Sequence, residues 1–285
     1  MATTPITRFA PSPTGRLHLG HAYSAMVASR LGDGYTLRID DIDHTRCRPE
    51  YTAQIRDDLT FLGLPWRGEP VLQSNRLDHY ALALDRLRDM DLVYPCFLTR
   101  AELAGVLSAP HAAPQATDSI LPADEAARRA GSGKSPAWRL RTARALEMAG
   151  DPAWLDLRHG THRPADMTAH GDVVVARRDI GTSYHLSVVV DDMLDSVTLV
   201  TRGTDLEDST HVHCLLQAIL DIPAPAYFHH DLVCDEDGQR LAKRHDALSI
   251  AELRQSGLSA TEILSRLPHF AENAIIDLDC SLFSN

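Results

Sequence analysis

Two histidines in the tetrad His18-Leu19-Gly20-His21 offer the clearest chemistry in the sequence. The tetrad follows a Pro- and Gly-containing loop and opens a stretch of helical composition. A helix N-terminus presents unpaired N–H groups to phosphate, and Gly20 lets a nucleotide approach the backbone. The two imidazoles can donate to phosphate oxygens whose charge grows during attack on an α-phosphorus. The tetrad therefore predicts nucleotide chemistry, although such a short pattern alone also fits two histidines without a role.

A basic run lies more than two hundred residues later, at Arg240-Leu241-Ala242-Lys243-Arg244. A loop of this kind can fold over a triphosphate and neutralise the leaving pyrophosphate. The alternative is a solvated basic run. Lys243 favours the first interpretation, because Lys134 is the only other lysine and the remaining positive charges are arginines. A lysine supplies a compact, mobile point charge.

Composition places limits on the classes of protein that fit. The chain has 285 residues, 44% of them hydrophobic, with a net charge of −11. This is a globular composition with room for a sizeable core, and the acidic balance disfavours loose electrostatic binding of nucleic acid. The N-terminus lacks the features of a signal peptide, and no apolar run is long enough to span a membrane. Five scattered cysteines without a CxxC pair indicate free thiols in a reducing compartment, so we expect a cytoplasmic protein.

Strands and helices are predicted to alternate from the N-terminus, which is typical of a parallel α/β sheet. In the first part, strands are expected at 6–10 and 34–40, and helices at 17–31, from Pro49 onward and at 76–92. The Ala-, Pro-, Gly- and Ser-rich segment 108–136 is interpreted as a mobile surface segment, partly helical around 124–129. Beyond it, strands are expected at 137–141, 172–176, 185–190, 197–200 and 227–234, and a helix at 208–222.

Ordered motifs connect these elements to a known family. Residues 8–15 read RFAPSPTG, the tetrad follows, and residues 38–43 read RIDDID. These stretches resemble the RFAPSPTG, HIGH and R-I-E-D-x-D motifs of class I glutamyl-tRNA synthetases. Residues 240–244 look like the KMSKS loop of that family, and residues 189–192 and 202–206 also match. The resemblance implies a class I aminoacyl-tRNA synthetase fold, a Rossmann-type parallel sheet split by an inserted α+β subdomain.

Domain boundaries follow from the same resemblance. We expect residues 1–94 to form the first half of the nucleotide-binding domain and residues 95–184 an inserted acceptor-type subdomain. Residues 185–285 would form the second half, with the KMSKS-like loop and a C-terminal helical region. Only residues 245–285 follow that loop, so no anticodon-binding domain is expected. The chain therefore is most similar to the stand-alone catalytic paralogues, the glutamyl-Q tRNA(Asp) synthetase family.

The function that this resemblance implies is a tRNA modification. Members activate L-glutamate with ATP, used with Mg²⁺, and transfer it to the queuosine base at the wobble position of tRNA(Asp). Unlike glutamyl-tRNA synthetases, they do not need tRNA for the activation step. The expected partners are thus L-glutamate, ATP and queuosine-containing tRNA(Asp), with no membrane, and the chain is expected to act as a monomer.

Site residues are transferred from the family position by position. The implied glutamate pocket consists of Arg8, Ala10, Ser12, Asp40, Tyr184 and Arg202. The implied ATP site consists of Pro11, His18, Gly20, His21, Arg240, Leu241 and Lys243, with His18, His21 and Lys243 as the catalytic groups. A guanidinium suits a carboxylate, an acid suits the substrate ammonium, and a phenol can orient the ligand. Two alternatives remain open: Arg202 could pair with Asp205, and Tyr184 could be a core residue.

Two departures from the family pattern affect these expectations. Asp40 stands where the family usually has glutamate and is one methylene shorter, so its contact with the ammonium could be longer or bridged by water. Many members also carry a zinc site with a Cys-x-Cys pair after a tyrosine-rich turn. Here Cys96 is followed by Leu98 in place of the second cysteine, and one thiolate does not make a tetrahedral site. No structural zinc is expected.

Three other functions fit parts of the sequence. A minimal glutamyl-tRNA synthetase would charge the 3′ end of tRNA. Another HxGH nucleotidyltransferase could adenylate a different small acid, although Asp40, Tyr184 and Arg202 disfavour it. A catalytically silent nucleotide- or RNA-binding module is the third alternative, against which the intact His18, His21 and Lys243 stand.

Overall fold

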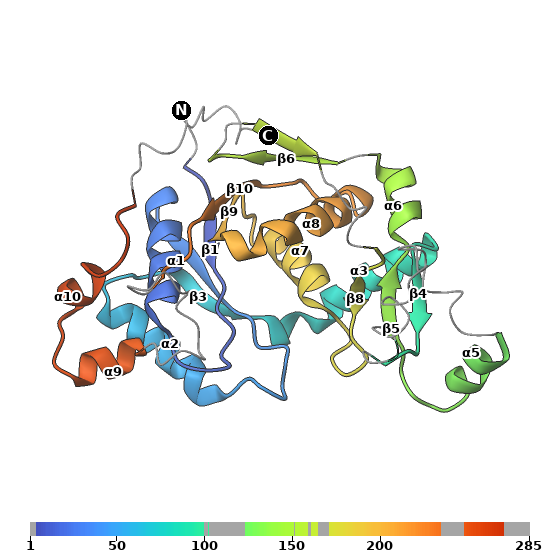
Figure 1. The fold of residues 1–285 in the computed structure, drawn as a ribbon, viewed down its shortest axis with the longest axis horizontal. Helices are drawn as coiled ribbons and strands as arrows, with labels where there is room; N and C mark the ends of the chain where they lie inside the picture. Colours follow the sequence, from blue (N-terminus) through green and yellow to red (C-terminus); the bar gives the residue numbers. More distant parts are fainter. Residues whose placement is uncertain are drawn as a thin grey trace.

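The computed structural model describes residues 4–99, 102, 123–150, 152–158, 161–164, 171–234 and 248–270. Within these ranges the chain forms three small sheets surrounded by helices (Figure 1). No helix in the described ranges combines the length and the apolar content that a membrane span requires.

The first sheet is parallel and contains β1 (Thr7–Phe9), β2 (Tyr35–Ile39) and β3 (Arg67–Leu72), in that order. Parallel neighbours need a crossover connection, usually a helix. Here α1 (Leu19–Leu31) connects β1 to β2, and α2 (Pro49–Phe61) connects β2 to β3. This part of the sheet confirms the strand and helix alternation predicted for the N-terminal region.

The second sheet combines strands from the later part of the chain. Its order is β7 (Thr161–Pro164), β6 (Ala153–Asp156), β10 (Ala226–His230) and β9 (Leu199–Gly203). β10 is parallel to both β9 and β6, whereas β6 and β7 are antiparallel. The crossover from β9 to β10 is α8 (Glu207–Ile219).

The two sheets meet at β1 and β9, which are their edge strands. The backbone N–H groups of Thr198 and Leu199 both donate to the carbonyl of Ile6, at 3.0 and 3.1 Å. Strands from the two ends of the chain therefore lie in one layer, as the expected split parallel sheet requires.

A third, antiparallel sheet is formed by the segment between these halves. It contains β4 (Val93–Cys96), β5 (Ala137–Leu140) and β8 (Val174–Ala176), in that order. The remaining elements are η1 (Gln73–Arg76), α3 (Leu77–Asp89), α5 (Ala123–Ala130), α6 (Thr142–Ala149), α7 (Tyr184–Leu194), η3 (Thr204–Leu206), α9 (Ile250–Gln255) and α10 (Ala260–Leu264). Figure 1 shows α9 and α10 at the end of the molecule opposite the antiparallel sheet.

Two large apolar cores stabilise this arrangement. One lies between α1, α2 and the first parallel sheet and extends to α9 and α10 through Ile250, Leu253 and Ile263. The other joins α3, α7 and α8 to the antiparallel sheet. The first core includes residues of β1, β2, β9 and β10 and so packs the two parallel sheets together, whereas the second packs the helices against the antiparallel sheet.

One predicted strand, at 185–190, is wrong, because these residues belong to helix α7. The run Val188–Val190 favours a strand by intrinsic propensity, but Ser183 caps a helix here by accepting from the N–H of Leu186. Residues 186–192 are all buried, so this middle part of the helix has no solvent-facing side and shows no helical period in the sequence.

The other predicted elements agree with the structure within a few residues. The strand expected at 227–234 is shorter and ends at His230, and the one expected at 197–200 is β9, shifted toward Gly203. The helix expected around 124–129 is α5, whereas residues 108–122 of the same segment lie outside the described residues. Strands β3, β4, β6 and β7 were not predicted.

Candidate active site

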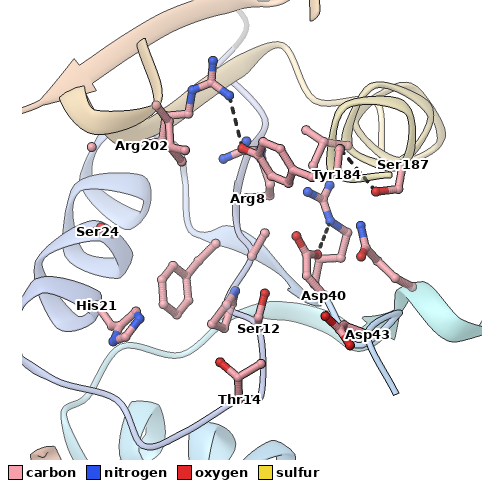
Figure 2. Close-up of a pocket in the computed structure, with 18 of the residues that line it drawn as sticks. Arg8, Ser12, Thr14, His21, Ser24, Asp40, Asp43, Tyr184, Ser187 and Arg202 are labelled. Atoms are coloured by element: carbon pink, nitrogen blue, oxygen red, sulfur yellow. Dashed lines mark hydrogen bonds and ion pairs between the residues drawn. The ribbon is translucent and has the colours of Figure 1, made fainter. Parts of the chain in front are cut away.

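A cavity of about 510 Å³ lies where the carboxyl ends of β1, β2, β9 and β10 meet the N-termini of α1 and α7. Ligands of open parallel α/β sheets bind at this edge, at the point where the strand order changes direction. Figure 2 shows Arg8, Ser12, Asp40, Tyr184 and Arg202 around the cavity, with His21 and Ser24 on the adjacent helix α1.

The two histidines of the tetrad form the cap of helix α1. His18 is the N-cap residue, and its Nδ1 accepts from the N–H of Gly20 at 3.1 Å. The N–H of His18 donates in turn to Nδ1 of His21, also at 3.1 Å. The ring centroids are 3.8 Å apart. This reciprocal arrangement is a capping box built from two imidazoles.

The capping bonds determine which nitrogen of each ring carries the proton. Because Nδ1 accepts in both His18 and His21, each neutral ring is protonated at Nε2 and can donate there. A Cβ added to Gly20 would lie 3.0 Å from Cε1 of His18, so glycine also keeps the first ring in place. The helix start therefore supplies two imidazole donors, which suits a phosphate, whereas the backbone N–H groups of Gly20, His21 and Ala22 already donate to His18.

Asp40 extends into the cavity from the end of β2. Its Oδ1 accepts from Nε of the fully buried Arg38 at 2.9 Å. Burial raises the pKa of Asp40 to about 6, and the positive charge of Arg38 opposes this effect without cancelling it. A cationic ligand group beside Asp40 would favour its charged form, so the site fits an ammonium.

A buried ionic network lies behind Asp40. Asp192 on α7 accepts from Nε of Arg8 at 3.1 Å and from Nη1 of Arg38 at 2.7 Å. Burial alone would raise the pKa of Asp192, but the two guanidinium groups outweigh it and lower the pKa. Asp191, one residue earlier, accepts from Arg76 at 2.9 Å. Arg8 and Arg38 are thus already paired with carboxylates of the protein.

Arg202, at the end of β9, has different surroundings. It is 5% exposed. Its Nη1 donates to the hydroxyl of Tyr184 at 3.4 Å, and its Nη2 donates to Oγ1 of Thr210 at 2.6 Å. Nε and Nη1 donate to ring nitrogens of His229 and His213, both at 3.2 Å. All of these partners are neutral acceptors, so the positive charge of Arg202 remains available to an anionic ligand.

The sequence left two alternatives open, that Arg202 pairs with Asp205 and that Tyr184 is a core residue. The guanidinium bonds of Arg202 among the described residues include none to Asp205. Tyr184 is 38% exposed and lines the cavity, so it is not a core residue. Both findings favour ligand contact for this pair of side chains (Figure 2).

A second polar contact lies close to the tetrad. Ser24, one turn along α1, lies 3.0 Å from Nε2 of His230 at the end of β10. The Nδ1 of His230 lies 2.9 Å from the carbonyl of Asp231, which only a protonated Nδ1 can contact favourably. Burial lowers the pKa of His230, so this ring is neutral and tethers α1 to β10 at the edge of the cavity.

The structure brings the predicted residues of the described part of the chain into this one cavity. They are Arg8, Ala10, Pro11, Ser12, His18, Gly20, His21, Asp40, Tyr184 and Arg202. Arg240, Leu241 and Lys243 lie outside the described residues, so their roles stay predictions.

Several polar residues of the site were not singled out from the sequence. Arg38 belongs to the quoted motif at 38–43 and Asp192 to the one at 189–192, so the motifs could have indicated that both residues lie at the site. Asp43, Arg46 and Arg177 form a further group at the cavity, where Arg46 and Arg177 lie 2.8 and 3.3 Å from Asp43. Nothing in the sequence indicated a role for His213, because it lies behind Arg202 and outside the quoted motifs.

Metal-binding side chains do not cluster in the described ranges, where no group of three or more histidine, cysteine, aspartate or glutamate residues could hold an ion. The expected absence of a structural zinc remains a prediction.

Comparison with known proteins places this geometry in a wider context. Residues 6–270 match the family described as tRNA synthetases class I (E and Q), catalytic domain. The chain is 45% identical to a glutamyl-Q tRNA(Asp) synthetase of Rhodobacter capsulatus, over 90% of this chain and 98% of that protein. It is 41% identical to one from Symbiobacterium thermophilum, over 93% and 85%.

Glutamate-specific ligases with longer chains are also similar. A glutamate–tRNA ligase of Synechococcus sp. is 38% identical, and the match covers 88% of this chain and 53% of that protein. The crystal structure of a glutamate tRNA ligase from Elizabethkingia meningosepticum in complex with its amino acid superimposes with a TM-score of 0.70 at 25% identity. That match covers 90% of this chain and 53% of the solved one.

Proposed function

The chain belongs to the family of class I tRNA synthetase catalytic domains for glutamate and glutamine, and on this premise we propose that it activates L-glutamate with ATP and transfers it to the queuosine base at the wobble position of tRNA(Asp). The main support is the similarity to glutamyl-Q tRNA(Asp) synthetases, at 39–45% identity over about nine tenths of this chain. Glutamate–tRNA ligases reach 37–39%.

Glutamate is the substrate that the cavity fits by charge. Asp40 supplies an anionic oxygen for the α-ammonium. Arg202 supplies a guanidinium that bonds to no carboxylate among the described residues, and the hydroxyl of Tyr184 lies beside it. Arg8 also lines the cavity, but its Nε and Nη1 are engaged by Asp192 and by the carbonyl of Thr201. Together these groups bind and orient an amino acid with two carboxylates.

The first step forms an acyl-adenylate. An oxygen of the α-carboxylate attacks the α-phosphorus of ATP, the bond from that phosphorus to the β-bridging oxygen breaks, and pyrophosphate leaves with its Mg²⁺. Negative charge grows on the phosphate oxygens during this step. We propose that the Nε2–H groups of His18 and His21 stabilise this charge, with Lys243 as the cation of the site.

The second step transfers the glutamyl group. A hydroxyl of the queuosine ring attacks the acyl carbon of the adenylate, the bond from that carbon to the phosphate oxygen breaks, and AMP leaves. We propose that the reaction takes place in the cytoplasm, which agrees with four free thiols at Cys47, Cys96, Cys214 and Cys234 in the described ranges. We propose that the chain acts as a monomer.

The decisive experiment is glutamate-dependent exchange between ATP and pyrophosphate, measured with and without tRNA, followed by mapping of the nucleotide that carries labelled glutamate. Exchange without tRNA and label on the anticodon base would support the proposal. Label on the 3′ end of the tRNA would instead identify a glutamyl-tRNA synthetase. ATP binding without exchange would indicate a silent binding module.

Replacing His21 tests the role of the tetrad. His21→Ala should reduce the exchange rate by about 100- to 1000-fold, because it removes one donor to the α-phosphate in the transition state. The exposed His44, which does not line the cavity, provides the matched control His44→Ala. Circular dichroism would verify that both variants are folded at the assay temperature. Near-normal exchange in folded His21→Ala would remove this histidine from the mechanism.

A further inference from the structure

A chain of imidazoles leads away from the cavity behind Arg202. His213 on α8 is 1% exposed, and its Nδ1 lies 3.2 Å from Nη1 of Arg202. Its Nε2 lies 3.2 Å from Nδ1 of His185, at the start of α7 and half-buried. His213 does not line the cavity, so it can act on a ligand only through Arg202.

The proton positions in this chain follow from one fact, that a guanidinium can only donate. Because Nη1 of Arg202 donates, Nδ1 of His213 must accept, and the neutral ring of His213 carries its proton on Nε2. That N–H then donates to Nδ1 of His185, which must accept in its turn. Each bond in the sequence Arg202–His213–His185 therefore has one possible direction.

The charges around His213 maintain this state. Burial lowers the pKa of His213 well below its ordinary value, and positive charge on Arg202 of β9 and His185 of α7 acts in the same direction. Arg8 of β1 and His229 of β10 lower the pKa of His213 as well, and the ring of Tyr184 lies 5.5 Å away. None of these groups is an acid. A protonated His213 would place two donors and two positive charges face to face.

We propose that His213 is a positioning residue for substrate recognition: it holds the guanidinium of Arg202 toward Tyr184 and the cavity by accepting from Nη1, and His185 maintains the required tautomer from behind. The inference rests on the proposed function, in which Arg202 binds a carboxylate of glutamate. An aspartate or glutamate at position 213 would hold Arg202 equally well but would neutralise it. A neutral imidazole orients the arginine and leaves its charge for the substrate.

The kinetic test compares two substitutions that differ in the acceptor. His213→Leu removes the acceptor, whereas His213→Asn retains an oxygen close to the position of Nδ1. We expect His213→Leu to raise the KM for glutamate by about 10- to 100-fold, the usual loss of a hydrogen bond to a charged group. The KM for ATP should stay near the wild-type value, and His213→Asn should recover most of the glutamate affinity. His211→Leu, two residues earlier on α8, is the matched control.

A spectroscopic measurement tests the arrangement without substrate. Nitrogen-15 NMR of the imidazoles at neutral pH should show His213 protonated at Nε2 and unprotonated at Nδ1. A proton on Nδ1 would overturn the proposal even if His213→Leu proves unstable. An unchanged glutamate KM in His213→Leu would also overturn it, and so would equal losses of glutamate affinity in the leucine and asparagine variants. In either case, exchange activity of the wild-type protein would leave the proposed function intact. A wild-type protein without glutamate-dependent exchange would overturn both.

Discussion

Arg38 and Arg202 are both buried arginines on parallel strands, and both lie at the same cavity, but their partners are opposite in character. Arg38 lies within salt-bridge distance of four carboxylates, those of Asp40, Asp191, Asp192 and Asp195. Arg202 has two imidazoles, a threonine and a tyrosine as its hydrogen-bond acceptors.

The difference distinguishes an arginine paired within the protein from one that we propose to bind a ligand. A buried charge is costly unless it is paired, and Arg38 is paired within the protein, where it joins β2 to α7. Among the described residues Arg202 is hydrogen-bonded to no carboxylate, so a ligand carboxylate is the partner that we propose to complete its pairing. Removing the partners of Arg38 should thus affect folding most, and removing Arg202 should affect substrate binding most.

The largest effect on stability is expected from the acidic network. Asp192→Ala leaves Arg8 and Arg38 without a shared carboxylate, and breaking a buried pair in this way costs about 3–5 kcal/mol of unfolding free energy. Urea denaturation would measure it. Asp85, which pairs with Arg88 on the surface, gives the control Asp85→Ala with an expected loss of about 0–1 kcal/mol. Equal losses in the two variants would contradict the structural role of the network.

The corresponding change in the other region is Arg202→Leu. It should lower kcat/KM for glutamate by at least about 100-fold, because a buried charged contact to the substrate is lost. Its stability should fall by no more than about 2 kcal/mol, since the groups left behind are neutral acceptors. Pyrophosphate exchange and urea denaturation of the same preparation measure both quantities. A loss of unfolding free energy in Arg202→Leu as large as that in Asp192→Ala would contradict the difference between the two arginines.

A smaller, graded effect is expected from pH. Asp40 must be ionised to attract the ammonium of glutamate, and burial raises its pKa to about 6. Protonation below this pKa removes the negative charge, so kcat/KM for glutamate should decrease roughly tenfold per unit as the pH falls below about 6. Asp40→Asn should be poorly active and lack this transition. A wild-type profile that is flat between pH 5 and pH 7 would contradict the assignment.

The smallest effect concerns Asp58 on α2, a buried carboxylate to which none of the described arginines is hydrogen-bonded. It is 2% exposed, and its Oδ2 has no hydrogen-bond partner in the described part of the chain. Burial, with the nearby Asp57, raises its pKa to about 6. The folded state therefore binds this proton more tightly than the unfolded state. The stability that the protonated carboxyl provides is complete below about pH 4 and is lost as the pH rises through about 6.

Asp58→Asn should remove that loss. The variant is expected to be more stable than the wild type by about 1 kcal/mol at pH 8 and to match it near pH 4. Thermal unfolding at the two pH values measures the difference. A lower stability of the variant at pH 8 would show that the charged form of Asp58 has a partner that compensates its burial.

Local patterns in the sequence were sufficient for part of the fold and part of the site. β1, α1, β2 and α2 were predicted because their hydrophobic periods and their Pro and Gly boundaries are contained in short windows. The histidine tetrad was recognised for the same reason, since its two rings interact across three residues.

Features that depend on distant contacts could not be predicted in this way. Residues 186–192 in the middle of helix α7 are all buried, so this stretch has no helical period and its valines favour a strand. The bond between Arg38 and Asp192 spans 154 residues, and nothing in either local sequence indicates it. The imidazole acceptors of Arg202 come from α8 and β10, which lie side by side only in the folded chain.

The junction between β1 and β9 also has a consequence for synthesis of the protein. The N–H of Ile6 donates to Thr198, and Arg8 bonds to Asp192, across separations of 192 and 184 residues. At translation rates of about 5–20 residues per second, the edge of β1 stays unpaired for roughly 10–40 s before β9 has been synthesised. An unpaired strand edge can recruit other chains. We therefore expect chaperone binding to the nascent N-terminal half, and the site forms only after the residues around 192–203 have been synthesised.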